Sequence, residues 1–185
     1  MAEDARARWN RRWREDQLRS EPSGYLLSVA HLLPASGRAL DVAGGAGRNA
    51  FFLAEHGLDV TLLDISAVAV ELAQTESARR GLAVAALELD LEAQPLPDSP
   101  WDVILVFHYL QRSLFPALIE ALSPKGLLVC ELATVRNLER HDRPSLPYLL
   151  EEGELLALIP GLEVLDHSER WTEEGRHEAR VTATR

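Results

Sequence analysis

The sequence predicts an α/β fold: a doubly wound, mostly parallel seven-stranded sheet with a C-terminal antiparallel hairpin. Short apolar runs alternate with segments of helical period along most of the chain, which is the pattern of parallel strands joined by crossover helices. A glycine-rich stretch directly follows the first apolar run, where such folds turn sharply from strand to helix. The tail from Leu162 to Arg185 indicates two strands around a turn at Glu173–Gly175.

Each strand expected in the parallel part is a short run rich in apolar or β-branched residues and bounded by turn-forming residues. In chain order these strands are Arg38–Val42, Asp59–Asp64, Val84–Leu91, Trp101–Phe107 and Leu127–Glu131. A proline-rich loop precedes the fourth strand, and the turn Ser123–Gly126 precedes the fifth.

The expected helices are delimited by residues that start or stop a helix. Gly57 and Gly81 suit the left-handed position after a helix, Ser66 can cap a helix start, and Pro160 stops the last one. The helices are Arg48–His56, a segment from Ser66 to Gly81, Ser113–Leu122 and Glu152–Ile159. Thr134–Pro147 has no clear period and is expected to be a loop.

The composition favours one globular domain spanning residues 1–185, with 46% hydrophobic and 26% charged residues. The net charge of −10 argues against a nucleic-acid partner, because phosphate backbones would be repelled. One cysteine, Cys130, excludes an intrachain disulfide and suits a cytoplasmic location. No apolar stretch approaches the length of about 20 residues that a membrane span needs, so no membrane partner is expected. Monomer and homodimer both stay open.

The segment Ala39–Asn49 is the strongest functional signal. Its glycines allow a sharp turn and close approach of a ligand, and the following helix start offers free N–H groups to an anionic group. Asp64 ends the next strand, where a carboxylate can bind both hydroxyls of a ribose. The plainer interpretation is a tight turn with a surface aspartate.

The spacing Gly45-x-Gly47-x-x-Ala50 also fits a dinucleotide-binding turn. Asp41 favours a different ligand, because a carboxylate inside the first strand can hold an amino group but adds nothing to pyrophosphate binding. A dinucleotide-binding oxidoreductase therefore stays as the alternative. A cofactor-binding regulatory protein without turnover is a third hypothesis.

These residues resemble the class I S-adenosylmethionine-dependent methyltransferases, and more narrowly the small tellurite-resistance and thiopurine methyltransferase branch. The resemblance covers nearly the whole chain. The matching segments are Leu40–Asn49, Asp64, Leu89–Leu91, Trp101–Phe107, Leu122–Leu128 and the paired strands of the tail. Ala43 departs from the family pattern, since it replaces the first glycine of the turn.

The resemblance implies a methyltransferase that uses S-adenosyl-L-methionine as cofactor and a Rossmann-like fold. The residues it assigns to the cofactor are Trp13, Asp41, Ala43, Gly45, Gly47, Asp64, Ile65, Asp90, Leu91 and Phe107. Asp41 and the glycine turn would bind the methionine part, Asp64 the ribose and Asp90 the adenine. Residues 1–24 would form an N-terminal helix and lid over the cofactor, although Trp9 and Trp13 would also fit a simple hydrophobic anchor.

The expected acceptor is a small molecule, with a thiol or a chalcogen oxyanion among the candidates. Catalytic roles are expected for His108, as a base at the end of the fourth strand, and for Arg112. The residues expected to line the acceptor site are Trp9, His108, Tyr109, Arg112, Arg136 and Arg143. A soft acceptor would need no base, and His108 could merely pack at a strand end. No histidines have metal-ligand spacing, so no metal is expected.

Overall fold

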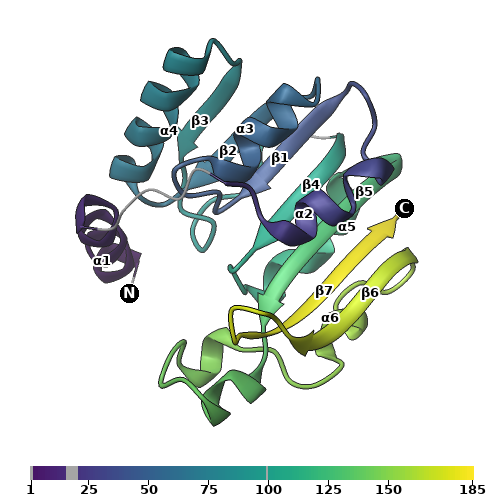
Figure 1. Ribbon diagram of the computed structural model, residues 1–185. Coiled ribbons are helices and arrows are strands. Elements are labelled where there is room, and N and C mark those ends of the chain that lie inside the picture. The colour runs from purple at the N-terminus through teal and green to yellow at the C-terminus, as the bar shows by residue number, and fades with distance from the viewer. Residues whose placement is uncertain (1, 16–20, 99) are drawn as a thin grey trace.

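A computed structural model describes residues 2–15, 21–98 and 100–185, with side chains from residue 5 onward (Figure 1). The strands are β1 (Arg38–Val42), β2 (Asp59–Asp64), β3 (Val84–Glu88), β4 (Trp101–Phe107), β5 (Leu122–Ala133), β6 (Glu163–Trp171) and β7 (His177–Thr184). The α-helices are α1 (Ala2–Glu15), α2 (Gly24–Ser28), α3 (Arg48–Glu55), α4 (Ala67–Arg80), α5 (Phe115–Ala121) and α6 (Glu154–Ala157). Short 3-10 helices lie at Ala30–Leu32, Arg112–Leu114, Val135–Glu139 and Leu146–Tyr148.

The strands form one seven-stranded sheet in the order β3-β2-β1-β4-β5-β7-β6. The first five strands pair in parallel, whereas β7 runs antiparallel to both β5 and β6. The predicted fold class and C-terminal hairpin are therefore confirmed. Because parallel strands share one carboxyl edge, the loops after β1, β2 and β4 gather at the same side of the molecule (Figure 1).

Two apolar layers cover the sheet, and β4 divides its side chains between them. Val103, Leu105 and Phe107 pack with α2, α3 and α4, while Ile104 and Val106 pack with α5 and α6. This alternation follows from the two-residue period of a strand that is buried on both faces. Among the described residues, no helix combines the length and apolar character needed to cross a membrane.

The structure differs from the sequence prediction in local detail. β3 ends at Glu88 instead of Leu91, because Asp90 starts a turn in which its carbonyl accepts from the N–H groups of Ala93 and Gln94. The expected turn at 123–126 lies within the bounds of β5, as an irregularity where Lys125 adopts a positive φ. The segment expected as a loop at 134–147 contains 3-10 turns.

Ala43 adopts the left-handed conformation with φ 53°, and the resemblance noted above implies a glycine at this position. A residue with a Cβ in this conformation destabilises the fold by about 1–2 kcal/mol. Glycine removes that strain but loses more conformational entropy on folding, so the net gain is smaller. We therefore expect Ala43→Gly to raise the free energy of unfolding by about 0.5–1 kcal/mol. Urea denaturation measures this, and a lower stability of the variant would contradict the strain argument.

Candidate functional site

The glycine turn between β1 and α3 is held by the end of β2. The N–H of Gly45 donates to Asp64 Oδ2 at 2.9 Å, and the N–H of Ser66 donates to Asp64 Oδ1 at 2.8 Å. Gly44 N–H also donates to the carbonyl of Leu63 at 3.0 Å. Asp64 is therefore buried under the turn as a structural partner of the loop, and Ile65 beside it is half-buried.

Asp41 lies beneath this turn and is 1% exposed, and neither carboxylate oxygen makes a well-formed hydrogen bond among the described residues. The N–H of Ala50 and the charge of Arg48 act on the carboxylate but offset only part of the cost of its burial. Burial raises the pKa of Asp41 to about 7. A Cβ on Gly44 would approach Asp41 Oδ2 to 2.6 Å, so the carboxylate sits directly against the backbone of the turn. A buried carboxylate without a well-formed hydrogen bond is costly, which points to a cationic ligand that would complete the site.

Helix α1 covers the turn from outside. A Cβ on Gly45 would overlap the indole of Trp13, so the ring lies on the glycine backbone. Asn10 Oδ1 accepts from Ser66 Oγ at 2.7 Å, and Arg6 pairs with Glu88 at 3.3 Å. Trp9, on the same helix, is half-buried with Arg12 over its ring at 5.3 Å. Of the predicted lid segment, residues 1 and 16–20 fall outside the described part of the chain.

The expected adenine side follows β3. Asp90 is buried and accepts from the N–H of Glu92 at 3.0 Å, while Leu91 packs into the apolar core. The hydroxyl of Tyr109 donates to Gln111 Oε1 at 2.6 Å, and Gln111 Nε2 donates to the carbonyl of Leu91 at 3.1 Å. These bonds tie the loop after β4 to the loop after β3, beside the glycine turn.

His108 is the first residue after β4 and adopts a positive φ of 58°. Its backbone N–H donates to the carbonyl of Glu131 at 2.8 Å. Its ring lies between two charged groups: Nδ1 is 3.8 Å from Glu178 Oε1, and Nε2 is 3.5 Å from an Nη of Arg48. Phe107 is buried beside it, with ring centroids 6.5 Å apart. A left-handed conformation in a residue other than glycine is a feature that recurs at functional sites.

Behind His108 lies a buried cluster of charged groups that the sequence analysis did not identify. Glu131 on β5 and Glu178 on β7 hydrogen-bond to each other, and an Nη of Arg180 donates to both, at 3.0 and 3.1 Å. The hydroxyl of Ser23 donates to Glu131 Oε2. Burial and the neighbouring Glu131 raise the pKa of Glu178, which favours a proton on this carboxyl group.

Arg112 is held by four hydrogen bonds to the segment 147–154. Nε and Nη2 donate to the two carboxylate oxygens of Glu154 at 2.5 and 2.8 Å, and two further bonds reach the carbonyls of Pro147 and Leu149. The hydrogen bonds to Glu154 raise the pKa of Arg112 above its ordinary value. These contacts fit a residue that clamps the 146–154 segment better than one that touches an acceptor.

Replacing Arg112 by alanine is expected to destabilise the fold by about 1–2 kcal/mol, because it removes a bidentate ion pair and leaves two carbonyls without their donor. Arg136→Ala is the matched control, since Arg136 forms an exposed ion pair with Glu139 on the same 3-10 segment and should change stability by less than about 0.5 kcal/mol. Equal effects in denaturant titrations of the two variants would rule out the clamp.

The other expected acceptor residues lie in the segment after β5. Arg136 is paired with Glu139 at 2.8 Å, and Arg143 is exposed. Their neighbours are also engaged: Arg140 stacks over Trp171 at 3.7 Å, and His141 Nε2 contacts the carbonyl of Gly175 at 2.8 Å. The structure therefore brings His108 to the glycine turn but gives Arg136 and Arg143 no contact with it.

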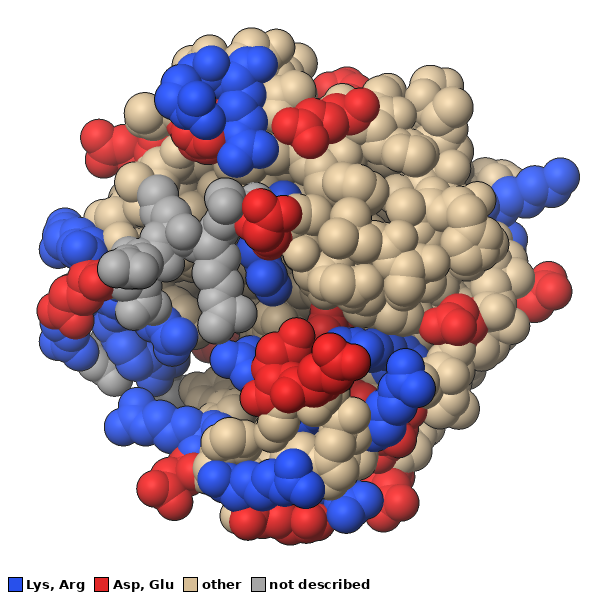
Figure 2. Space-filling view, viewed as in Figure 1, with Lys and Arg blue, Asp and Glu red and all other residues tan. Residues whose placement is uncertain are grey.

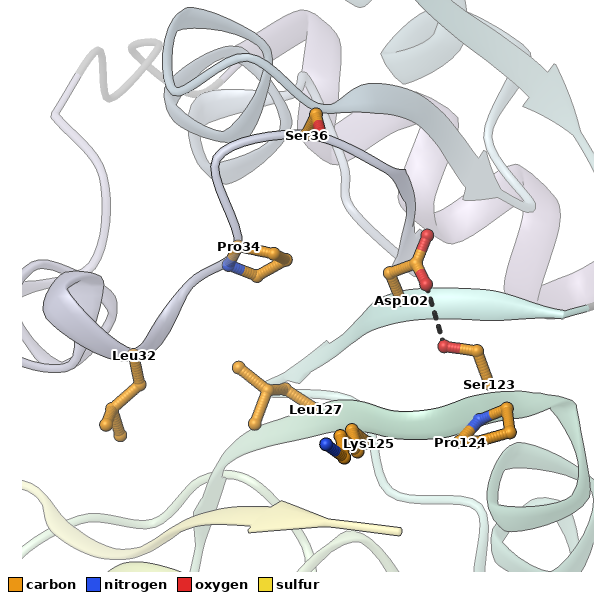
Figure 3. Close-up of a pocket in the computed structure, with 8 residues that line it drawn as sticks. All are labelled: Leu32, Pro34, Ser36, Asp102, Ser123, Pro124, Lys125 and Leu127. Carbon is orange, nitrogen blue, oxygen red and sulfur yellow. Dashed lines mark hydrogen bonds between the residues drawn. The ribbon is translucent and has the colours of Figure 1, made fainter.

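Two surface pockets lie away from the turn. A pocket of about 340 Å³ lies at the opposite edge of the sheet, where Asp102 accepts from Ser123 Oγ at 2.7 Å (Figure 3). A second, of about 330 Å³, lies between α2 and β6 and reaches Arg180. On the face shown in Figure 2, basic and acidic side chains are interspersed over the lower half, without a continuous field of one sign.

Comparison with known proteins identifies the central part of this chain. Residues 39–126 match the family model described as methyltransferase domain. The tRNA 5-carboxymethoxyuridine methyltransferase of Escherichia coli K12 is 29% identical over 122 residues, which make up 62% of this chain and 47% of that protein. The chain thus spans about half the length of the curated relative it matches.

Solved structures share the fold at low sequence identity. TehB from Haemophilus influenzae superimposes with a TM-score of 0.75 at 19% identity, covering 89% of this chain and 62% of TehB. The magnesium protoporphyrin IX methyltransferase ChlM from Synechocystis PCC 6803, with bound SAH, gives 0.72 at 15% identity over 100% and 99% of the two chains. The [4+2]-cyclase SpnF gives 0.73 at 19%, covering 92% and 84%. The resemblance to class I methyltransferases is confirmed by the family match and this shared fold.

Proposed function

We propose that this chain, whose residues 39–126 match a methyltransferase domain, transfers the methyl group of S-adenosylmethionine to a small-molecule acceptor. The observation that carries the proposal is Asp41, a buried carboxylate directly beneath the glycine turn whose oxygens make no well-formed hydrogen bond among the described residues. The α-ammonium group of the cofactor would supply the missing cation, and its carboxylate could accept from the N–H groups at the start of α3. A pyrophosphate in the same place would be repelled by Asp41, which argues against the dinucleotide-binding oxidoreductase.

The residues of this edge fit the remaining parts of the cofactor. The methionine part of the cofactor would lie against the backbone of the turn at Ala43, Gly45 and Gly47. The carboxylate of Asp64 has about four lone-pair positions, and two of them accept from the N–H groups of Gly45 and Ser66. The other two would be left for ribose hydroxyls. The residues near the nucleoside would be Ile65, Asp90, Leu91 and Phe107. When bound, the sulfonium supplies an activated methyl group; the chain's part is to position the acceptor near His108 and exclude water.

The acceptor could be a nucleic acid or a small molecule, and the charge of the chain bears on this choice. A relative that acts on tRNA, according to its name, leaves the expected absence of a nucleic-acid partner unsupported. A net charge of −10 and interspersed surface charges favour a small acceptor instead. Methylation of tRNA by this chain, measured with labelled cofactor, would replace the small-molecule assignment.

Isothermal calorimetry with S-adenosylhomocysteine and NAD tests the cofactor assignment. We expect one site for S-adenosylhomocysteine and no heat with NAD. Binding of NAD alone would favour the oxidoreductase. Binding of S-adenosylhomocysteine with no methyl transfer to tRNA or to any compound in a metabolite extract would favour a regulatory protein without turnover.

The position of Trp13 predicts an optical signal for that binding. Because the indole lies on Gly45, a cofactor at the glycine turn must move it or pack against it. We expect S-adenosylhomocysteine to change the tryptophan emission of the wild type. Trp171→Phe is the control and should respond in the same way, because Trp171 packs on Arg140 and His177. Trp13→Phe should lose most of that change. An unaltered response in Trp13→Phe would remove α1 from the cofactor site.

A further inference from the structure

We propose that the methyl acceptor carries a proton on its attacking atom, as an O–H or N–H group does, and that His108 takes this proton while Glu178 holds the imidazole in the required tautomer. The inference rests on the proposed function and narrows its acceptor class. It assigns Glu178 as a positioning residue, and it disfavours acceptors that are already anionic, such as carboxylates and chalcogen oxyanions.

Three strands bring the groups together at the carboxyl edge of the sheet. His108 follows β4, and the neighbouring strand pairs Glu131 with Phe107 on one side and with Arg180 of β7 on the other. One ligand-type atom each of His108, Glu131 and Glu178 lie within 4.8 Å of one another. The glycine turn occupies the same edge, and Arg48 of α3 contacts His108 from that side.

The surroundings of the imidazole favour one tautomer. Nε2 lies 3.5 Å from a guanidinium nitrogen of Arg48, a group that can only donate, so Nε2 is the nitrogen without hydrogen. Nδ1 lies 3.8 Å from Glu178 Oε1, which is ion-pair distance, so a hydrogen on Nδ1 faces this carboxyl group. An acceptor O–H or N–H group that takes the place of Arg48 at Nε2 would meet the lone pair that a base needs, and a carboxyl group beside the other nitrogen is the usual support.

The charge balance of the cluster favours proton transfer over metal binding. The guanidinium of Arg180 already donates to Glu131 and Glu178, and Ser23 donates to Glu131 as well. A divalent cation would have to displace these donors. A protonated His108 displaces none of these donors, because the carboxylate of Glu131 stabilises its positive charge by electrostatic attraction without a direct bond. An anionic acceptor would gain nothing from a base at this position.

The lone pair of the acceptor atom forms a bond to the methyl carbon, and the carbon–sulfur bond breaks with its electron pair left on the sulfur. The acceptor's proton moves to Nε2 of His108, which becomes an imidazolium facing Glu178. The proton then leaves to solvent through the one-third-exposed ring.

Histidine side-chain ¹⁵N NMR of the full chain tests the tautomer without acceptor or cofactor. The His108 signal is assigned by its loss in His108→Gln. We expect the Nδ1–H tautomer in the wild type, whereas a neutral histidine free in water prefers Nε2–H. Glu178→Leu removes one of the two contacts that favour Nδ1–H and should lower the fraction of this tautomer, although Arg48 still faces Nε2. Glu178→Gln should restore Nδ1–H, because its amide oxygen can face Nδ1–H as the carboxyl oxygen does.

Glu163→Leu, at an exposed position on β6, is the matched control and should leave the His108 signal unchanged. An Nε2–H tautomer in the wild type, or equal signals in the wild type and Glu178→Leu, would overturn the proposal. Calorimetry with S-adenosylhomocysteine on the same variants keeps the two proposals apart. Unchanged affinity with a changed tautomer supports this inference, and absence of binding in every protein would refute only the cofactor assignment.

The chemistry of the product tests the acceptor class. Methyl-labelled S-adenosylmethionine is incubated with the protein and a metabolite extract of the expression host, and the labelled products are treated with base. Methyl esters release volatile methanol under base, whereas O-methyl ethers and N-methyl groups keep their label. Label that stays non-volatile supports a protic acceptor. Label released as methanol shows carboxylate methylation and contradicts the proposal.

Discussion

Asp41→Asn is expected to stabilise the protein at pH 8 by about 2 kcal/mol while weakening the binding of S-adenosylhomocysteine 10- to 100-fold, roughly the loss of one buried charge-assisted hydrogen bond. Burial raises the pKa of Asp41 from 3.8 to about 7 in the folded chain. The folded state therefore binds more protons than the unfolded state between these values, so this group lowers stability as pH rises through the interval. Above pH 7 the buried, ionised Asp41 lowers the stability by about 4 kcal/mol. Asparagine removes the charge but is still a buried polar group, so only part of this loss is recovered.

Urea denaturation at pH 4.5 and pH 8 measures the effect. The gap between the variant and the wild type should be small at pH 4.5, where Asp41 is protonated in the folded protein, and large at pH 8. Asp59→Asn, at an exposed aspartate that starts β2, is the matched control and should change neither stability nor affinity. A variant that is less stable than the wild type at pH 8 would show that Asp41 has a cationic partner in the free protein.

The fold could be predicted from the sequence because its signals are local. Each parallel strand is a short apolar run with a glycine, serine or proline at its boundary, and the turn at Ala43–Gly47 lies within one βα unit. The end of β3 could not be placed, because Leu89 and Leu91 continue the apolar pattern although they serve the core outside the strand. The 3-10 turns after β5 have no periodic signal.

In the candidate site, too, residues of one local unit could be predicted, whereas residues that meet only through strand pairing could not. Asp41, Gly45 and Asp64 could be predicted because they belong to one strand–turn–helix–strand unit. Glu131 and Glu178 could not, because their meeting depends on the antiparallel register of β5 with β7, and a shift by one residue would turn Glu178 to the other face. The ion pair of Arg112 could not be predicted either, because its partner Glu154 is 42 residues away in the sequence.

Arg180→Met is expected to destabilise the protein by about 3 kcal/mol at pH 8 and by less at pH 5. The guanidinium is mostly buried and donates to Glu131 and Glu178, and methionine would fill its space without neutralising Glu131. The uncompensated carboxylate would then have a raised pKa in the folded state. Such a group binds extra protons on folding, so its penalty grows as pH rises and disappears as pH falls.

Two further variants separate lost charge from lost packing. In Arg180→Met/Glu131→Gln the anion is removed together with its partner, so most of the stability at pH 8 should return, because a neutral hydrogen-bonded pair replaces a buried lone charge. Arg170→Met removes an exposed arginine from the adjacent strand β6 and should change stability by less than about 0.5 kcal/mol. If the double variant is no more stable than Arg180→Met at pH 8, the guanidinium acts through packing instead of charge, and the electrostatic account of this cluster behind His108 is wrong.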